Sequence, residues 1–209
     1  SASKSGSTTA GGAQTITSAV TISATANPAT GYINAGANDV PVFGFQISPA
    51  TGSIDFSGVT VTKSGDATSS DLSSFEVIYD ADGDGVYDVG ETTVSSTPQA
   101  IGSTIVFTIT GQTGITSARK YLVIADVASG ATAGRTFTGS IDLASDVTTT
   151  GTESGTATGN TQTIRTAPIL TSPTATAIGQ TAATLGATLS ANGGATVTDY
   201  GVVWNTAAA

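Results

Sequence analysis

Residues 104–110, TIVFTIT, carry the clearest structural pattern of the sequence. The odd-numbered positions of this stretch hold Ile105, Phe107 and Ile109, and its even-numbered positions hold Thr104, Val106, Thr108 and Thr110. An alternation of period two is typical of a β-strand with one buried face. β-Branched and aromatic residues also fit a pleated, half-buried surface. The stretch therefore predicts a strand that buries every second side chain.

The same signal recurs on both sides of this strand. Further runs rich in Val, Ile, Phe, Tyr and Thr occupy residues 40–47, 54–63, 75–79, 92–95, 119–127 and 135–143. Gly, Ser, Thr and Asp clusters separate the runs at the roughly 8–12-residue spacing of a sandwich or barrel. No run has the pattern of an amphipathic helix, although Asp71–Phe75 could form one short turn. The sequence predicts an all-β chain with an immunoglobulin-like β-sandwich over residues 27–165.

The N-terminal part differs from this domain in composition and residue pattern. Residues 1–13 are small and polar, which predicts a flexible lead. Over residues 14–26, Ile16, Val20 and Ile22 fall on one side of an alternating pattern that Asn27-Pro28 ends. We expect an N-terminal extension strand here, which could act as a donor strand to a neighbouring chain.

The composition and residue pattern change again in the C-terminal part. Residues 151–160 are a low-complexity Gly/Thr/Ser stretch, either a linker or an exposed strand edge that continues to Ile164. Thr166-Ala167-Pro168 indicates a boundary. In residues 166–209 we expect three strands, at 170–178, 182–189 and 200–204, and a turn at 192–194. Three strands are too few for a sandwich of about seven, so this partial second β domain is either truncated or completed by another chain.

Composition excludes several classes of function. The chain has 209 residues, 10% of them charged, and six Lys and Arg against 15 Asp and Glu give a net charge of −9. Nucleic-acid binding needs a basic face, and docking on anionic lipid needs basic residues, so both are disfavoured. The absence of Cys and His removes disulfides, thiol catalysis and the usual general base. No apolar run is long enough for a membrane span.

The location of the protein is inferred from the same features. The chain begins Ser1-Ala2-Ser3-Lys4 and contains no Met. This beginning resembles a mature end from which an export signal has been removed. We expect an extracellular protein at a cell surface or in a fibre.

The sharpest chemical motif is the acidic loop DADGDGVYDVGE, residues 80–91, which holds five of the 15 acidic residues. It matches the calcium-loop pattern D-x-D-x-D-G-x5-E at every defined position. Calcium takes six to eight oxygen ligands, and carboxylates at alternate positions converge when the chain curls around the ion. The predicted ligands are Asp80, Asp82, Asp84, the carbonyl of Val86, Asp88 and a bidentate Glu91. The alternative is a solvated acidic turn, since Asp-Gly pairs are common turn formers.

The β-like residues on both sides of this loop disfavour the two helices of an EF-hand. We therefore place the loop between two strands of the sandwich, where calcium would make a long connection rigid. Such a site is structural and would be filled at extracellular calcium concentrations.

The sequence supports a catalytic site less well than a calcium site. Asp55, Asp126, Asp142 and Asp146 are scattered along strands and turns rather than paired as a glycosidase requires. A Ser–Lys dyad would need Lys4, Lys63 or Lys120, and none lies in a known motif. We predict no enzyme.

Four aromatic residues could contact a surface glycan: Tyr32, Tyr87, Tyr200 and Trp204. For Trp204, burial in a strand is the simpler expectation.

Two stretches resemble known families. Residues 27–148 resemble a β module of large secreted bacterial surface proteins, through VFGF at 42–45, FSGVTV at 56–61, SDLS at 70–73, YDADGDG at 79–85 and YLVIADV at 121–127. The tail, through PTATAIG at 173–179 and GVVW at 201–204, resembles the first half of the fibronectin-III-like repeats of secreted Bacteroidetes- and Chlorobi-type proteins. The resemblance implies structural or adhesive surface proteins and no enzyme.

Three functional hypotheses follow from these observations. In the first, the chain is a structural subunit of an extracellular filament or surface fibre, a homopolymer assembled by non-covalent strand exchange and stabilised by calcium. In the second, it is a calcium-stabilised adhesin or carbohydrate-binding module that recognises a glycan or another cell-surface target. In the third, it is a non-catalytic segment of a secreted enzyme.

Overall fold

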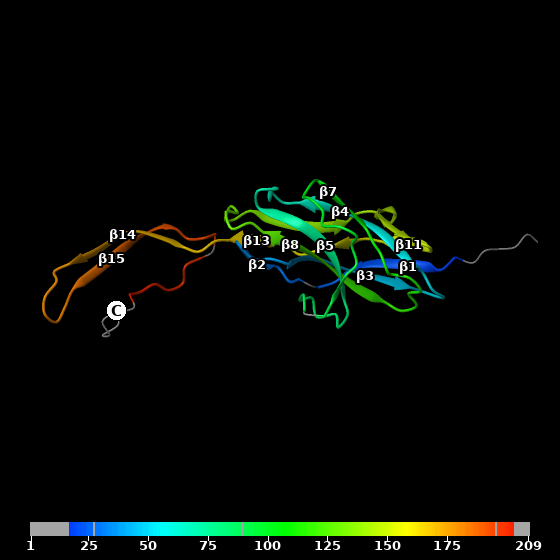
Figure 1. Ribbon diagram of the computed structural model, residues 1–209, viewed down its shortest axis with the longest axis horizontal. Coiled ribbons are helices and arrows are strands. Elements are labelled where there is room, and N and C mark those ends of the chain that lie inside the picture. The colour runs from blue at the N-terminus through cyan, green and yellow to red at the C-terminus, as the bar shows by residue number, and fades with distance from the viewer. Residues whose placement is uncertain (1–16, 27, 89, 195, 203–209) are drawn as a thin grey trace, which may run out of the picture.

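The computed structural model describes residues 17–26, 28–88, 90–194 and 196–202 (Figure 1). The described residues are almost entirely strands and loops, which confirms the all-β prediction. Their one helical element is the 3-10 turn η1 (Ala144–Asp146). No helix in this described part is long and apolar enough to cross a membrane.

Thirteen strands form the two sheets of a sandwich. The first sheet has the order β11-β1-β3-β8-β5-β6 and contains β1 (Ala19–Ala24), β3 (Val40–Pro49), β5 (Leu72–Asp80), β6 (Thr92–Thr93), β8 (Arg119–Val127) and β11 (Thr152–Gly155). The second has the order β10-β4-β9-β13-β2, with β7 on β4 and β12 on β9. Its strands are β2 (Gly31–Asn34), β4 (Phe56–Ser64), β7 (Thr104–Thr108), β9 (Thr136–Ile141), β10 (Val147–Thr149), β12 (Ala157–Thr158) and β13 (Gln162–Arg165).

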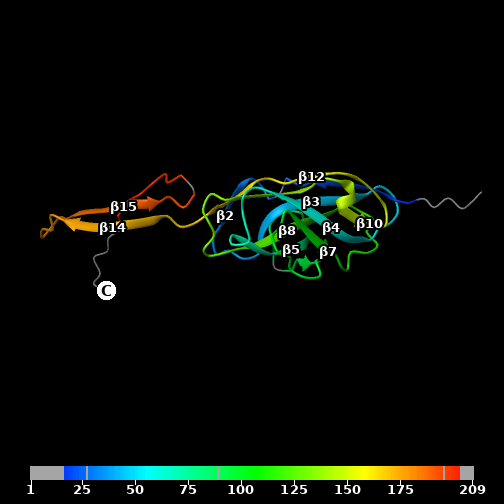
Figure 2. The same ribbon diagram turned by 90° about the horizontal axis from the view of Figure 1, so that it is seen from above.

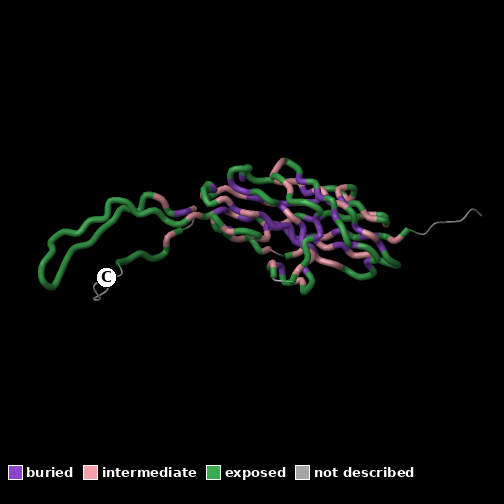
Figure 3. The backbone as a smooth tube through the Cα atoms, in the orientation of Figure 1, coloured by how far each residue is buried: buried purple, intermediate pink, exposed green. Residues whose placement is uncertain are grey.

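The core lies between these two sheets (Figure 3). In β7, Ile105 and Phe107 are buried while the residues between them are exposed, as the alternation predicts. Aromatic rings fill the centre: the Tyr121 ring lies 5.4 Å from that of Phe45 and 5.0 Å from that of Phe56. Aromatic pairs at these distances stabilise a core beyond the area they bury.

The strand predicted within residues 14–26 is present as β1, but it belongs to the sandwich and is not an extension outside it. It pairs antiparallel with β3, where Ile22 faces Ile47, and parallel with β11, where Val20 faces Glu153. Both edges of β1 are therefore occupied within its own chain, and Val20 and Ile22 belong to the core. Residues 14–16 of that prediction, and the lead of residues 1–13, lie outside the described residues.

Two other expectations are corrected. Residues 151–160 are not a linker, since β11 joins the first sheet and β12 pairs with β9; the strand alternative holds. The turn expected at Asp71–Phe75 lies earlier, where the amide groups of Asp71 and Leu72 donate to the carbonyl of Thr68. Strand β5 then begins at Leu72.

Beyond the sandwich, β14 (Ile169–Thr176) and β15 (Thr184–Ala191) form a two-stranded antiparallel hairpin. It projects from one end of the long axis, opposite the end at which β1 begins (Figures 1 and 2). The turn at Asn192–Gly194 follows β15 as predicted. Residues 200–202 are not in a strand, and Trp204 lies outside the described residues.

Candidate metal site in the β5–β6 loop

The acidic loop connects β5 to β6, which are antiparallel neighbours in the first sheet. Tyr79 pairs with Thr92 and Ile78 with Thr93. Asp80, the last residue of β5, and Glu91, directly before β6, therefore lie at the two ends of the loop where the strands meet. The strands on both sides hold the ends of the loop together, as the β-like flanks predict.

Three of the six predicted ligands converge. One carboxylate oxygen each from Asp80, Asp82 and Asp84 lies within 4.8 Å of the other two. Each carboxylate also turns the backbone: Asp80 accepts from the amide of Gly83 at 2.7 Å, Asp82 from Asp84 at 3.2 Å and Asp84 from Val86 at 2.8 Å. Gly85, at φ +82°, adopts the left-handed conformation that glycine tolerates best.

Asp80 differs from the other two because it is buried, whereas Asp82 and Asp84 are exposed. Burial is the main cause that raises the pKa of Asp80, and the charges of Asp82 and Asp84 raise it further. Hydrogen bonds from the amides of Gly83 and Gly85 oppose this shift without cancelling it. The ionised group is thus left without full compensation, and a divalent cation among the three carboxylates would supply it.

Glu91 closes the loop through the backbone. Its Oε1 accepts from the amide of Ala81 and its Oε2 from the amide of Asp88, both at 3.1 Å. The amide of Glu91 in turn donates to the carbonyl of Asp88 at 3.2 Å. Val86 and Asp88 are exposed. The donor set fits a hard cation at Asp80, Asp82 and Asp84, while ligation by Val86, Asp88 and Glu91 stays a prediction.

Two contacts of the loop were missed by sequence reasoning. The ammonium of Lys120 on β8 donates to the carbonyl of Gly83 at 2.9 Å, and Lys120 lies opposite Asp80 in the β5–β8 register. An ammonium group of the neighbouring strand is thus bonded to the backbone of the acidic loop. This pairing joins residues far apart in the chain, so no local pattern could have indicated it.

The second missed contact is Tyr87. It packs on a small cluster of Ile78, Leu122 and Ile124, separate from the main core. These three residues are at most 1% exposed, although their neighbours in β5 and β8 face the core. The acidic loop therefore folds back over the outer face of the first sheet, and holding it there keeps apolar surface away from water.

The other candidates lie apart from this loop. Asp55 accepts from the amide of Gly114 at 2.9 Å, Asp126 in β8 from Asp39 at 3.1 Å and Asp146 from Leu143 at 2.9 Å, so each binds backbone of its own surroundings. The three described aromatic candidates lie on separate segments. The ring of Tyr32 on β2 faces the Arg165 guanidinium at 5.6 Å, and Tyr200 follows the hairpin.

Comparisons with known proteins give little likeness. No protein-family model matches the chain, and no curated protein matches it significantly. It is similar to a chain of the CaDoc0917 variant–CaCohA2 complex, with 16% identity, 71% of this chain and 99% of that chain covered, and a TM-score of 0.33. It is also similar to a chain from the complex of the sixth cohesin of Acetivibrio cellulolyticus scaffoldin B with a variant Cel5 dockerin. That match has 16% identity, 69% and 99% coverage, and a TM-score of 0.24. At these TM-scores no property is carried over.

Proposed function

We propose that this chain is a structural subunit of an extracellular filament or surface fibre, in which a strand of a neighbouring subunit completes the β14–β15 hairpin and calcium stabilises the β5–β6 loop. The observation that carries the proposal is the exposed apolar face of the hairpin, where Leu170 and Leu185 line a hollow together with Tyr200 and Val202 but stay about half exposed or more. An isolated two-stranded hairpin is at best marginally stable in water, and three or more strands with a hydrophobic face are needed. A further strand on the described hairpin would supply what it lacks.

The hairpin is amphipathic because apolar residues pair with apolar residues across the two strands, and threonines pair with threonines. Leu170 pairs with Leu189 and Ala175 with Leu185, while Thr171 pairs with Thr188 and Thr176 with Thr184. Directly opposite residues share one face of a sheet. One face thus carries Leu170, Ala175, Leu185, Ala187 and Leu189, and the other carries mainly threonine. The three leucines are 65%, 47% and 45% exposed in chain order, and Figure 3 shows the hairpin as exposed except at its base.

The two edges of the hairpin are not equivalent. Strand β14 has an irregular register between Thr171 and Thr174, and Pro173 in that interval has no amide hydrogen to offer a new strand. Strand β15 contains neither proline nor charged residue, and the extra residue in its register lies near its end, between Leu189 and Ala191. An uncharged edge without such an insertion over residues 184–189 is open to strand addition. We assign the complementing strand to β15.

The architecture supports end-to-end assembly. The hairpin projects from one end of the long axis and β1 begins at the other (Figures 1 and 2). A contact between unlike ends of identical subunits propagates into an open chain rather than a closed dimer. Strand β1 is already paired on both sides, so the proposal does not use it as the donor.

Calcium has a supporting role in this proposal. Asp80, Asp82 and Asp84 would hold the ion, and the ion would fix the loop that carries Tyr87 over Ile78, Leu122 and Ile124. Extracellular calcium is abundant enough to fill even a weak site of this kind.

Light scattering with size-exclusion chromatography tests assembly. With calcium present, we expect the chain to form species much larger than a monomer. The double substitution Leu185→Asp and Leu189→Asp places charge on the apolar face and should return it to a monomer. The matched control Thr184→Asp and Thr188→Asp charges the opposite face of the same strand and should still assemble.

A monodisperse monomer at high concentration with calcium would contradict the proposal. Reproducible binding of that monomer to a glycan array would favour the adhesin instead.

A further inference from the structure

The hairpin is attached to the sandwich at both of its ends. Strand β13 leads into β14 through residues 166–168, and β15 returns to the sandwich at the turn Asn192–Gly194. There the amide of Thr166 donates to the carbonyl of Gly193 at 2.9 Å. Gly193 is buried, in contrast to the exposed strands beyond it.

Only glycine fits the two positions of this turn that touch the sandwich. Gly193 and Gly194 have φ of +73° and +81°, a conformation that costs residues with a Cβ. A Cβ on Gly193 would collide with the carbonyl oxygen of Thr166. A Cβ on Gly194 would lie 2.9 Å from the amide nitrogen of Gly134 and 3.2 Å from the carbonyl oxygen of Ile164. The turn is therefore seated closely against its neighbours.

The surface that receives the turn is the β8–β9 loop, residues 128–135. Its Gly134 amide donates to the carbonyl of Ile164 and the Ile164 amide to the carbonyl of Arg135, both at 2.8 Å. The loop is thus bonded to β13, the strand that continues into the hairpin.

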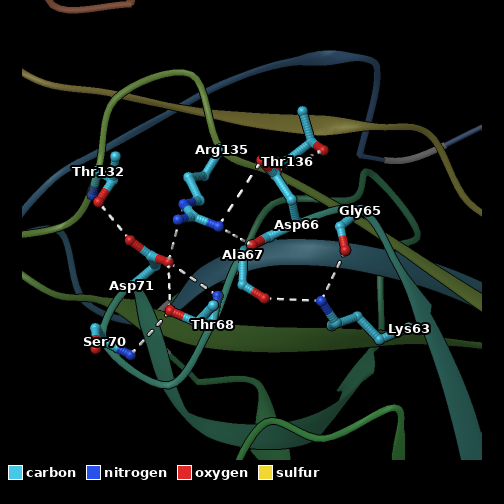
Figure 4. Close-up of polar contacts among 10 residues, drawn as sticks. All are labelled: Lys63, Gly65, Asp66, Ala67, Thr68, Ser70, Asp71, Thr132, Arg135 and Thr136. Atoms are coloured by element: carbon cyan, nitrogen blue, oxygen red, sulfur yellow. Dashed lines mark hydrogen bonds and ion pairs between the residues drawn. The ribbon is translucent and has the colours of Figure 1, made fainter.

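A polar network braces this loop from its other side (Figure 4). Buried Asp71 accepts from the amide of Thr132 at 2.8 Å. Arg135 donates to the carbonyl of Asp66 at 2.7 Å, and its guanidinium lies 3.9 Å from the Asp71 carboxylate. The Asp66 carboxylate accepts from the amide of Thr136 at 2.7 Å. The β8–β9 loop is therefore fixed to the β4–β5 connection as well as to β13.

We propose that the braced 128–135 loop is a socket for the Asn192–Gly194 turn and fixes the direction of the hairpin, so that sandwich and hairpin form one stiff arm. The bond between Thr166 and Gly193 closes the base of the hairpin, and the contact of Gly194 with Gly134 joins that base to the loop. Together they restrain bending better than the covalent connection at 166–168 alone. This inference concerns the single chain and holds whether or not chains assemble.

Distance measurements between two spin labels test this inference, because the sequence has no cysteine. Labels go on Asn38→Cys in the sandwich and Thr181→Cys beyond β14, both exposed sites. The doubly labelled chain is diluted with excess unlabelled chain so that contacts between subunits do not contribute. We expect one narrow distance distribution.

Adding Gly193→Ala, or the milder Gly194→Ala, should broaden that distribution several-fold while the thermal unfolding of the sandwich is retained. The control Gly179→Ala should leave it narrow, since a Cβ there lies 3.7 Å from the nearest atom, at ordinary contact distance. A broad distribution in the parent chain would overturn the inference, as would a narrow one in both glycine variants. Failure of the chain to assemble would leave this result unaffected.

Discussion

The sandwich and the hairpin are built from similar strands but have opposite surroundings. Phe45, Phe75 and Phe107 are at most 1% exposed in the sandwich, whereas Leu170 in the hairpin is 65% exposed. Both regions alternate apolar and threonine-rich positions along their strands. Alternation therefore specifies which face of a strand can be buried, whereas burial itself depends on a second layer. The sandwich contains that layer, and the described hairpin lacks it.

The largest effect on the free energy of unfolding should come from a substitution in the sandwich core, and a hairpin substitution should have almost none. Phe107→Ala removes a ring at the centre of the core and should cost about 3–5 kcal/mol of unfolding free energy. Leu189→Ala truncates a side chain that is already 45% exposed, so it should leave the unfolding of the monomeric sandwich unchanged. Urea denaturation of the two variants measures both effects. An equal loss of stability would show that the hairpin belongs to the folding unit of the sandwich.

The next effect concerns calcium and the charge of Asp80. If free calcium is present at about 100 times its dissociation constant, binding stabilises the folded chain by about 2.7 kcal/mol. Chelation should therefore lower the melting temperature and expose the cluster beneath Tyr87 to a hydrophobic dye. Asp82→Ala with Asp84→Ala should abolish the response, while the control Asp142→Ala should preserve it. A melting temperature that does not change on chelation would contradict the calcium site and favour a solvated acidic turn.

Asp80→Asn sharpens this test because its effect should change sign. Burial raises the pKa of Asp80, so in the metal-free chain the ionised carboxylate is a cost that asparagine removes. Without calcium the variant should be at least as stable as the parent, and with calcium it should be less stable. Thermal melts at neutral pH in chelator and in calcium give the comparison. A variant less stable under both conditions would mean that Asp80 serves only the turn.

A smaller effect should appear on acidification, at the network beneath the hairpin. Burial alone would raise the pKa of Asp71, but hydrogen bonds from Thr132 and Thr68 and the charge of Arg135 outweigh it and lower the pKa below the ordinary 3.8. A lowered folded-state pKa gives stability that is present above the unfolded value and is lost as pH falls through the folded value. Asp71→Asn should cost about 1–3 kcal/mol at pH 7 and should flatten the dependence below pH 4.

Urea midpoints measured at pH 7 and at pH 3 would show this change. The exposed Asp142→Asn serves as the control and should keep the pH dependence of the parent. A parent-like dependence in Asp71→Asn would remove Asp71 from the acid response.

The smallest expected effect is that of salt on assembly. Residues 166–198 contain no charged side chain, so the hairpin offers nothing for salt to screen. Raising sodium chloride should leave the size of the assemblies unchanged, as light scattering would report. Dissociation at moderate salt would indicate an interface on the acidic sandwich instead.

Local patterns predicted the strands well and their partners poorly. The alternation at 104–110 and the apolar run at 119–127 correspond to β7 and β8 because each records the burial of its own faces. The place of β1 could not be read in the same way. Its pairing with β11 joins Val20 to Glu153, and register between segments so distant is not encoded in either segment alone.

In the candidate site, too, the local features were predicted and the contacts between distant segments were not. The motif at 80–91 predicted the convergence of Asp80, Asp82 and Asp84, because its spacing is local. Lys120 comes from β8, and the apolar cluster under Tyr87 comes from β5 and β8 together, so both emerge only when these two strands pair.

Electron microscopy of the full chain with calcium is the most direct test of whether a neighbouring subunit completes the hairpin. We expect unbranched filaments for the parent chain and for Thr184→Asp with Thr188→Asp, and isolated particles for Leu185→Asp with Leu189→Asp. Isolated particles from the parent chain at high concentration, or filaments from the leucine variant, would contradict this completion.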